Sequence, residues 1–378
     1  MLYMRLPRIY DDLEKHLAPN RVLVLYGPRQ VGKTTILQSY LATTKWKYRL
    51  EVGDDIHAQE IIGSKDLRWL TEFTEGYNLI AIDEAQRIPN IGLGLKILVD
   101  NIPGIRVIVT GSSSFELSGQ VGEPLTGRKK TLILYPLSQY ELRSQHSAYD
   151  LKRDLENFLI FGSYPEVLTA RKRSDKIAVI MEIVGSYLLK DILELDRVKS
   201  SKVLLDLLRL LAFQIGKEVS LRELAAQLGI DYKTVARYID LLEKSFVLYN
   251  LRGYSRNLRK EITKKSKYYF YDNGIRNGII SNFNMLPRRD DIGPLWENFL
   301  VSERAKLQAY KPIRSNNYFW RTWDQKEIDF IEEREGMLYG FEFKWGAKKV
   351  TAPRDWLEAY PESVFTVIDR EGYLDFIS

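Results

Sequence analysis

A glycine-rich stretch near the N-terminus, GPRQVGKTT, has the residue types and spacing of a phosphate-binding loop. It satisfies G-x-x-x-x-G-K-[ST], with Gly27, Gly32, Lys33 and Thr34 at the defining positions. The glycines let backbone N–H groups face phosphate oxygens, and a helix that starts here points its positive end at the same anion. Lys33 would add charge at the β- and γ-phosphates, and the Thr34 hydroxyl would coordinate Mg²⁺. The predicted ATP-binding residues are Gly27, Pro28, Arg29, Gln30, Val31, Gly32, Lys33, Thr34 and Thr35.

A second stretch, NLIAIDEAQ at residues 78–86, is an apolar run that ends in two acids. Asp83 would hold Mg²⁺, directly or through water, and Glu84 would activate the attacking water. Buried strands often end in acids, so this pattern gains its meaning from the phosphate-binding loop that precedes it.

Three further residues are candidates for sensing or stabilising the γ-phosphate. Thr110 or Ser112, at the end of the apolar run RVIVTGSSS, would contact that phosphate, although such residues also cap helices. Arg128 follows a glycine in PLTGRKK and would act as an arginine finger, within its own subunit or on a neighbour. A plain surface arginine is the alternative for Arg128.

A second group of acids lies near the C-terminus, in EIDFIEEREGMLYGFEFKW at residues 327–345. Two alternating runs flank Glu335–Gly336, which suits a two-residue hairpin turn. With that turn, Asp329 lies opposite Glu342 and Glu327 lies opposite Lys344. The other face of the hairpin is expected to be apolar, formed by Ile328, Phe330, Phe341 and Phe343.

This arrangement matches the D…E-x-K pattern of metal-dependent nucleases. Asp329 and Glu342 would share one Mg²⁺ that acidifies water, and Lys344 would position that water or steady the phosphate. Glu297, in the helical pattern GPLWENFLVSERAKL, would be a further metal ligand. Two alternatives stay open: a solvated hairpin face with a Glu327–Lys344 ion pair, and a core that binds DNA without cleaving it.

Several of these stretches together resemble one large family of prokaryotic AAA-type ATPases. The matching segments are GPRQVGKTT, IDEAQRIPN, VTGSSSFELS, PLTGR, LYPLSQYEL, FGSYPEVL and YLLKDILELD, in the same order. The resemblance implies ATP binding and hydrolysis by a P-loop domain. It also implies a C-terminal domain of unknown function with a restriction-endonuclease-like core. Thr126 and Ser163 depart from the usual alanine and glycine, but neither departure touches the nucleotide residues.

The middle of the chain, residues 220–251, has the pattern of a helix-turn-helix. Ser220 and Glu223 form a capping box, Gly229 ends the first helix and Asp231 can cap the second. The DNA-facing residues would be Lys233, Thr234 and Arg237. In many AAA-type proteins such a module instead packs on the ATPase and transmits its state, so both readings stay open.

A basic segment follows the helix-turn-helix and would form the wing of a winged helix. Residues 252–267 hold seven Lys or Arg and one Glu, a local excess typical of nucleic-acid contact, although a solvated basic loop would look the same. The predicted contact residues are Arg256, Arg259, Lys260, Lys264 and Lys265.

Composition excludes several classes of protein. Cysteine is absent and the three histidines are scattered, which argues against disulfides, zinc chemistry and a Ser-His-Asp hydrolase. No apolar run approaches the length of a membrane helix, and the N-terminus lacks a signal segment. We therefore expect a cytoplasmic protein without membrane contact.

The predicted fold class is α/β with four units. Residues 1–145 would form the AAA-type P-loop domain with its parallel sheet, 146–205 a helical lid, 206–275 the winged helix and 276–378 the restriction-endonuclease-like domain. The cofactors would be ATP and Mg²⁺, and the partner DNA. The leading hypothesis is an ATPase whose nucleotide state controls DNA binding and cleavage. The alternative is a signalling switch whose C-terminal half binds a protein; the oligomeric state stays open.

Overall fold

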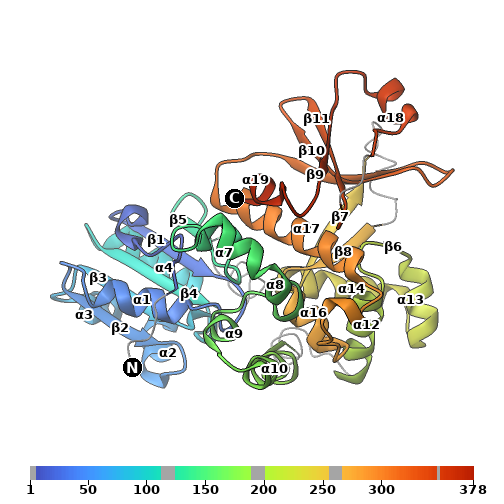
Figure 1. Cartoon of the computed structure of the whole chain (residues 1–378). Coiled ribbons are helices and arrows are strands. Elements are labelled where there is room, and N and C mark those ends of the chain that lie inside the picture. The colour runs from blue at the N-terminus through green and yellow to red at the C-terminus, as the bar shows by residue number, and fades with distance from the viewer. Residues whose placement is uncertain (1–5, 112–123, 189–200, 255–265, 347–349) are drawn as a thin grey trace.

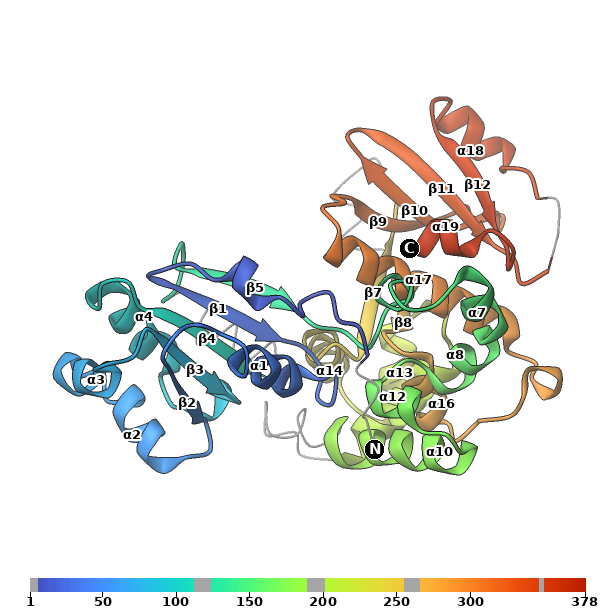
Figure 2. The same cartoon turned by 60° about the vertical axis from the view of Figure 1, so that its left-hand side comes forward.

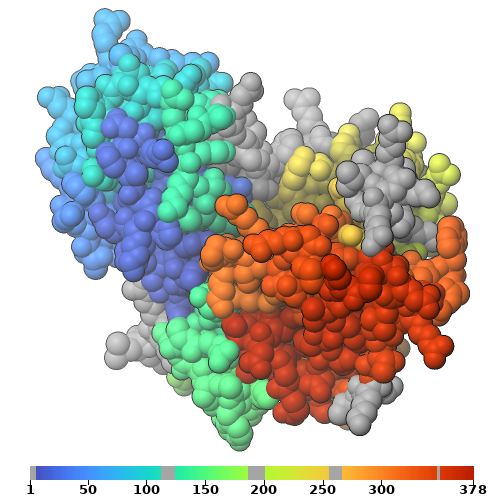
Figure 3. Space-filling model, turned by 90° about the horizontal axis from the view of Figure 1, so that it is seen from above, coloured from blue at the N-terminus to red at the C-terminus, as the bar shows by residue number. Residues whose placement is uncertain are grey.

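The computed structural model describes residues 6–111, 124–188, 201–254, 266–346 and 350–378. The N-terminal part (blue to cyan) lies beside the helices of the middle part and the C-terminal sheet (orange to red), as Figures 1 and 2 show. Seen from above in Figure 3, these parts form two lobes side by side.

The N-terminal part is built around a sheet of five parallel strands in the order β2-β3-β4-β1-β5. Its strands are β1 (Arg21–Tyr26), β2 (Tyr48–Val52), β3 (Leu79–Asp83), β4 (Arg106–Gly111) and β5 (Lys129–Ile133). Strand β4 lies between β1 and β3, which confirms the predicted additional strand between the two nucleotide motifs.

Helices cover both faces of this sheet, because its strands carry apolar residues on both sides. Leu23 and Leu25 pack toward α1, whereas Val22 and Val24 pack toward α2, α3 and α4. The elements are η1 (Leu13–His16), α1 (Lys33–Leu41), α2 (Ile56–Gly63), α3 (Leu67–Thr74), η2 (Ala85–Arg87) and α4 (Ile91–Asn101). The predicted nucleotide residues lie at the carboxyl ends of β1 and β3 in this packed sheet.

The middle part is helical. It comprises α6 (Gln139–Leu142), α7 (Ala148–Arg153), α8 (Leu155–Phe161), α9 (Pro165–Thr169), α10 (Arg173–Glu182), η3 (Ile183–Leu188), α12 (Ser201–Phe213), α13 (Leu221–Leu228), α14 (Tyr232–Lys244), α16 (Asn273–Ile279) and η4 (Leu286–Arg288). Helices α13 and α14 contact each other and form the predicted helix-turn-helix. Gly229 ends α13 in the left-handed conformation, as glycine at this position favours.

A second sheet of seven strands contains both the strands next to the helix-turn-helix and the C-terminal ones. Its order is β12-β11-β10-β9-β7-β8-β6. The strands are β6 (Glu218–Val219), β7 (Leu248–Gly253), β8 (Ser266–Phe270), β9 (Asn316–Arg321), β10 (Glu327–Arg334), β11 (Met337–Phe343) and β12 (Val364–Ile368). Because β7 pairs with β9, the predicted winged helix and the predicted C-terminal domain share one sheet.

Helix α17 (Ile292–Tyr310) is the central support of the C-terminal half. It packs against α8, α19 (Tyr373–Ile377), β8 and β11, and most of its side chains are buried. Helix α18 (Arg354–Ala359) covers the other face of the sheet, where Trp356 packs against Trp320.

A buried polar network joins segments that are distant in the sequence. Asp272 accepts hydrogen bonds from the Ser163 N–H (2.7 Å) and the Ile275 N–H (3.1 Å). Glu303 of α17 accepts from the Gln139 N–H (2.6 Å) and from Lys306 (2.7 Å). These bonds fasten two of the family-like motifs, LYPLSQYEL and FGSYPEVL, to the C-terminal half.

Within the part of the chain that the structure describes, no helix is both long and apolar enough to cross a lipid bilayer.

Candidate functional site

The predicted phosphate-binding loop connects β1 to α1 and curls around its own lysine. Lys33 is buried, and its ammonium donates to the carbonyl oxygens of Gly27 (2.9 Å) and Pro28 (2.6 Å). Gly27 has a φ of 152°, and a Cβ there would lie 2.0 Å from the Leu134 oxygen. Only glycine fits, and the loop forms a cradle of backbone groups ahead of α1.

The two predicted magnesium residues meet at the end of the sheet. The Thr34 hydroxyl donates to Oδ2 of Asp83 at 2.9 Å, so a hydroxyl and a carboxylate oxygen converge at the start of α1. Both are hard oxygen ligands of the kind that Mg²⁺ prefers, and the residues present fit a magnesium–nucleotide complex.

Thr110 lies behind Asp83 and is fully buried. Its hydroxyl donates to Oδ1 of Asp83 and accepts from the Glu84 N–H at 3.2 Å. Thr110 therefore fixes the two acids, and its contact with the γ-phosphate stays a prediction. The other candidate, Ser112, lies outside the described residues.

Glu84 follows Asp83 directly and has a left-handed backbone, with φ 53° and ψ 42°. This conformation is unusual for a residue with a Cβ and is often found at functional sites. Its carboxylate accepts from Nε2 of Gln86 at 2.6 Å. The sequence analysis missed Gln86 as a site residue, although it lies within the quoted motif IDEAQ.

Arg128 lies at the opposite end of the β1–β5 strand pair from the phosphate-binding loop. It precedes β5, and its carbonyl accepts from the Val22 N–H (2.9 Å) near the start of β1, whereas Gly27 follows the end of β1. Its guanidinium pairs with Asp100 near the end of α4. Arg128 thus lies away from the phosphate-binding loop of its own subunit in this structure, and its action as an arginine finger, within its own subunit or on a neighbour, stays a prediction.

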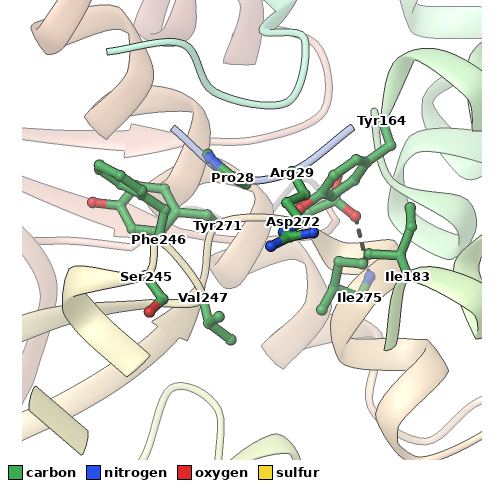
Figure 4. A pocket seen from close by; sticks show the side chains of 10 residues that line it. All are labelled: Pro28, Arg29, Tyr164, Ile183, Ser245, Phe246, Val247, Tyr271, Asp272 and Ile275. Carbon is green, nitrogen blue, oxygen red and sulfur yellow. Dashed lines mark hydrogen bonds between the residues drawn. The ribbon is translucent and has the colours of Figure 1, made fainter. Parts of the chain in front are cut away.

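The phosphate-binding loop also touches the C-terminal half. Pro28 and Arg29 line a small cavity of about 40 Å³ together with Phe246 and Asp272 (Figure 4). Phe246 forms the turn after α14 with a positive φ of 58°. Its ring centroid lies 5.8 Å from that of Tyr26, which immediately precedes Gly27. The nucleotide loop and the helix-turn-helix are therefore in direct contact.

The C-terminal hairpin has the predicted register. Strands β10 and β11 pair Phe330 with Phe341 and Arg334 with Met337, which leaves Glu335–Gly336 as the two-residue turn. Both turn residues have positive φ, 51° and 82°, as a type I′ turn requires. The prediction of this hairpin is confirmed.

The candidate acid–lysine cluster, defined here as Glu297, Glu327, Asp329, Glu342, Lys344 and Lys267, gathers beside this hairpin. Oδ2 of Asp329 accepts from the Phe343 N–H at 2.8 Å, and Lys344 donates to Oε1 of Glu342 at 2.5 Å. Burial, followed by the charges of Glu297 and Glu342, raises the pKa of Asp329 well above its usual range. The structure thus brings together all four residues that the sequence analysis assigned to this site.

The carboxylates of Glu297, Asp329 and Glu342 are not arranged to bind one metal ion together. Among the residues that the structure describes, no group of three or more His, Asp or Glu side chains could hold a metal ion. Glu297 instead accepts from the Tyr269 hydroxyl at 2.6 Å and from Lys267 at 3.3 Å. The three-carboxylate ligand set expected from the sequence is therefore not formed.

Two details of the hairpin differ from the sequence analysis. Glu327 pairs with Lys267 of β8, a strand of the same sheet, and not with Lys344, so the expected Glu327–Lys344 ion pair is not formed. A bulge in β10 relative to β9 turns Ile328 to the α18 side, where it packs with Ile331, whereas Phe330 faces α19. The prediction that Ile328 shares one apolar face with Phe330, Phe341 and Phe343 is therefore wrong.

Lys267 and Tyr269 are site residues that the sequence analysis missed. Lys267 was counted with the basic segment and at the start of a predicted strand, yet it is almost fully buried. Burial lowers the pKa of its ammonium, but the charges of Glu297, Glu327 and Asp329 outweigh this effect, so the pKa lies above its usual value. The predicted strand is the aromatic run KYYFYD at residues 267–272, and it was the signal that could have shown Lys267 turned inward.

The second helix of the helix-turn-helix presents its predicted DNA residues to solvent. Lys233 and Arg237 are exposed and Thr234 is half-buried. The predicted wing residues Arg256, Arg259, Lys260, Lys264 and Lys265 lie outside the described residues.

Three family models match the chain in succession. Residues 19–143 match an AAA domain, residues 152–285 match a domain of unknown function, DUF8612, and residues 292–364 match another, DUF4143. The expected AAA-type ATPase domain with a C-terminal domain of unknown function is confirmed at this level. The AAA domain implies nucleotide binding.

Relatives come from bacteria and archaea. The uncharacterized protein Rv2008c of Mycobacterium tuberculosis is 30% identical over 332 residues, which cover 87% of this chain and 71% of that protein. The uncharacterized protein MJ1544 of Methanocaldococcus jannaschii is 22% identical over 342 residues, which cover 85% of this chain and 74% of that protein.

Among solved structures, the RuvB Holliday junction branch migration motor of Thermotoga maritima shares 20% identity. The aligned region covers 61% of this chain and 81% of the RuvB chain. The TM-score is 0.26, and this low value supports no conclusion about this chain. The identity and coverage shared with Rv2008c are sufficient to define a family. The chain therefore belongs to the family of the mycobacterial protein Rv2008c, with an AAA ATPase domain followed by two domains of unknown function.

Proposed function

We propose that this chain hydrolyses ATP with Mg²⁺, and that its nucleotide state controls a C-terminal half that binds and cleaves DNA. The observation that carries the first part is the hydrogen bond between Thr34 and Asp83. It joins the phosphate-binding loop to the acidic end of β3, which is the arrangement that P-loop hydrolysis needs.

Each residue of the ATP site has a distinct task in this proposal. Lys33 would exchange its bonds to the Gly27 and Pro28 carbonyls for phosphate oxygens. Thr34 and Asp83 would hold Mg²⁺, which when bound neutralises phosphate charge. Glu84 would accept the proton of the attacking water, with Gln86 orienting its carboxylate.

The test is ATP turnover together with nucleotide affinity. Glu84→Gln should lower turnover about 10²- to 10⁴-fold, because a positioned base is lost, while ATP still binds. Lys33→Ala should weaken ATP binding itself. Glu75→Gln, an exposed glutamate of the same domain, is the matched control and should behave as wild type. Equal turnover in wild type and Glu84→Gln would remove Glu84 from the mechanism.

The acid–lysine cluster supports phosphodiester cleavage as the activity of the C-terminal half. Since three carboxylates do not converge, we narrow the proposed magnesium ligands to Asp329 and Glu342, with water at the remaining positions. Lys344 lies next to Glu342 and would orient the attacking water or steady the phosphate. Glu297 would act as a neighbouring charge.

Mg²⁺-dependent nicking of circular and linear DNA tests this activity. Asp329→Ala and Lys344→Ala should abolish nicking, whereas Glu358→Ala, on the exposed side of α18, should leave it intact. If the wild-type protein cleaves no DNA substrate with or without ATP, the nuclease role fails while the ATPase proposal stands.

A signalling switch is the rival function, and one contact favours it. The turn at Phe246 packs against the residue that precedes the phosphate-binding loop, so the helix-turn-helix can report nucleotide state without touching DNA. Gel-shift assays over a range of salt separate the two. Binding that falls steeply with salt supports DNA contact, because phosphate contacts release counterions. Retained ATPase activity without DNA binding supports the switch.

A further inference from the structure

A groove opens beside the acid–lysine cluster, and most of its lining residues belong to neither site described above. Its volume is about 830 Å³, and its walls come from the residues before β6, the end of β7, β9 and the loop that joins β9 to β10. The lining residues that matter here are Lys217, Tyr254, Phe319, Arg321, Trp323 and Glu327. Glu327 is shared with the cluster, so the groove leads directly to the proposed cleavage site.

Trp323 is the most unusual residue of this groove, because its side chain is fully exposed (102%). Exposing an entire indole to water is unfavourable, and exposed tryptophans are typical of binding surfaces. The ring is not on a loose loop: the Thr322 N–H donates to the Lys326 carbonyl (2.9 Å), and the Lys326 N–H donates to the Thr322 hydroxyl (3.1 Å). A tight turn therefore holds Trp323 out at the rim.

The chemistry of the walls fits a nucleotide chain. Tyr254 adds half-buried aromatic surface, whereas the ring of Phe319 is almost fully buried. The cations Lys217 and Arg321 share the walls with the acids Glu218 and Glu327, and Arg321 lies 3.7 Å from Glu327. An aromatic platform with nearby cations is how proteins bind unpaired nucleic acid, since every base offers a face for stacking. Bases inside a duplex are already stacked on each other and cannot cover Trp323 without being unpaired.

We propose that this groove binds an unpaired stretch of nucleic acid, with one base stacked on Trp323 and phosphates near Lys217 and Arg321. The inference rests on the proposed function, because it names the substrate class of the acid–lysine cluster. The groove guides a single strand, or the unpaired end of a duplex, toward Glu327 and the carboxylates behind it.

The test is fluorescence anisotropy of a labelled oligothymidylate with the full chain in EDTA, where metal and cleavage play no part. Trp323→Ala should weaken binding about 5- to 150-fold, the range for loss of one stacked base. Trp323→Phe keeps an aromatic face and should stay within about threefold of wild type. Trp69→Ala, an exposed tryptophan of the ATPase domain, is the matched control and should leave binding unchanged.

Two comparisons sharpen this test. Wild type should bind the single strand more tightly than the same oligonucleotide in a blunt duplex, and Trp323→Ala should remove that preference. Lys217→Ala should reduce the dependence of log affinity on log salt by about 0.7, the value for one phosphate contact to a single strand.

The outcomes separate this inference from the proposed function. If Trp323→Ala nicks DNA and binds the single strand as tightly as wild type, the proposed binding role of the groove is refuted and the proposed nuclease activity stands. If Trp323→Ala loses single-strand affinity and the wild-type protein shows no nicking activity, single-strand binding by the groove is supported and DNA cleavage is refuted. Wild type that binds no oligonucleotide, or that prefers the duplex, would overturn the inference.

Discussion

The ammonium of Lys267 lies 3.3 Å from Oε1 of Glu297, in a part of the C-terminal half that water hardly reaches. The same ammonium pairs with Glu327. Lys267 thus acts as an internal cation among carboxylates that would otherwise repel one another. Its strand, β8, connects this cluster to β7 of the helix-turn-helix region.

Replacing Lys267 by methionine should destabilise the protein strongly. The change leaves Glu297 and Glu327 without their buried cation, and breaking a buried pair in this way costs about 3–5 kcal/mol. Urea unfolding monitored by circular dichroism measures this loss. Lys326→Met removes an ion pair with Asp355 at the surface, and little change is expected there.

Magnesium should partly restore the Lys267→Met protein. The unpaired carboxylates would then attract a divalent cation, and a ligand that binds only the folded state raises its stability. Added Mg²⁺ should raise the melting temperature of Lys267→Met more than that of wild type. An identical response of both proteins would mean that Glu297 and Glu327 do not bind a cation after Lys267 is removed.

Gly162 and Gly229 allow a third prediction, since both end helices with positive φ. A Cβ at Gly162 would lie 2.0 Å from Oδ1 of Asp272, whereas a Cβ at Gly229 meets nothing within 4 Å. Gly229→Ala should therefore cost only the left-handed strain, about 1–2 kcal/mol. Gly162→Ala should cost about 3 kcal/mol or more, because its ψ of −155° also suits only glycine.

Thermal and urea unfolding of the two variants measure this difference. Equal losses would mean that the contact between Gly162 and Asp272 does not constrain the fold.

The sequence allowed prediction of features that depend on neighbouring residues. The phosphate-binding loop is contiguous, and the β10–β11 register follows from alternation around Glu335–Gly336, so both could be placed. The bulge that turns Ile328 away from Phe330 could not be foreseen, because apolar residues occur at 328, 330 and 331 and fit either face.

Contacts between distant segments were beyond such reasoning. FGSYPEVL resembled the family without suggesting any chemistry, and its partner Asp272 lies 109 residues after Ser163. Lys267 was grouped with exposed cations because charge counts along a segment do not show which side chain a strand turns inward. The motif around Arg128 likewise did not show that this residue precedes β5, at the far end of β1 from the phosphate-binding loop.

Asp272 should make stability depend on pH. Burial raises its pKa above the ordinary value of 3.8, and the charge of Lys306 and three backbone N–H groups only partly oppose this. The folded protein then takes up the proton at higher pH than the unfolded chain. The free energy of unfolding should rise as pH falls through the raised pKa, and this contribution becomes complete below 3.8.

Asp272→Asn should remove this contribution. The difference in unfolding free energy between wild type and Asp272→Asn should grow in favour of wild type as pH is lowered from neutral toward 3.8. Asp290→Asn, at an exposed position nearby, is the control and should follow wild type. A constant difference across this range would contradict a raised pKa at Asp272.

Phe246 offers a test of communication between the two halves. Its ring lies between Tyr26, which precedes the phosphate-binding loop, and Tyr271, which follows β8, with centroid distances of 5.8 and 6.2 Å. Its positive φ shows that the turn holds this ring in place against a local preference. A change of the loop on nucleotide binding would therefore displace Phe246 and, through it, the strand that carries Lys267.

Oligonucleotide affinity should accordingly differ between the ADP-bound protein and the protein with a non-hydrolysable ATP analogue, by about 5- to 150-fold for a typical coupling energy. Phe246→Leu keeps an apolar side chain but loses the ring contacts, and the difference should shrink to within about threefold. Phe283→Leu, which alters the stacked pair with Phe161, is the control and should retain the full difference. An undiminished difference in Phe246→Leu would mean that the signal passes through another contact, such as the buried bonds of Asp272 and Glu303.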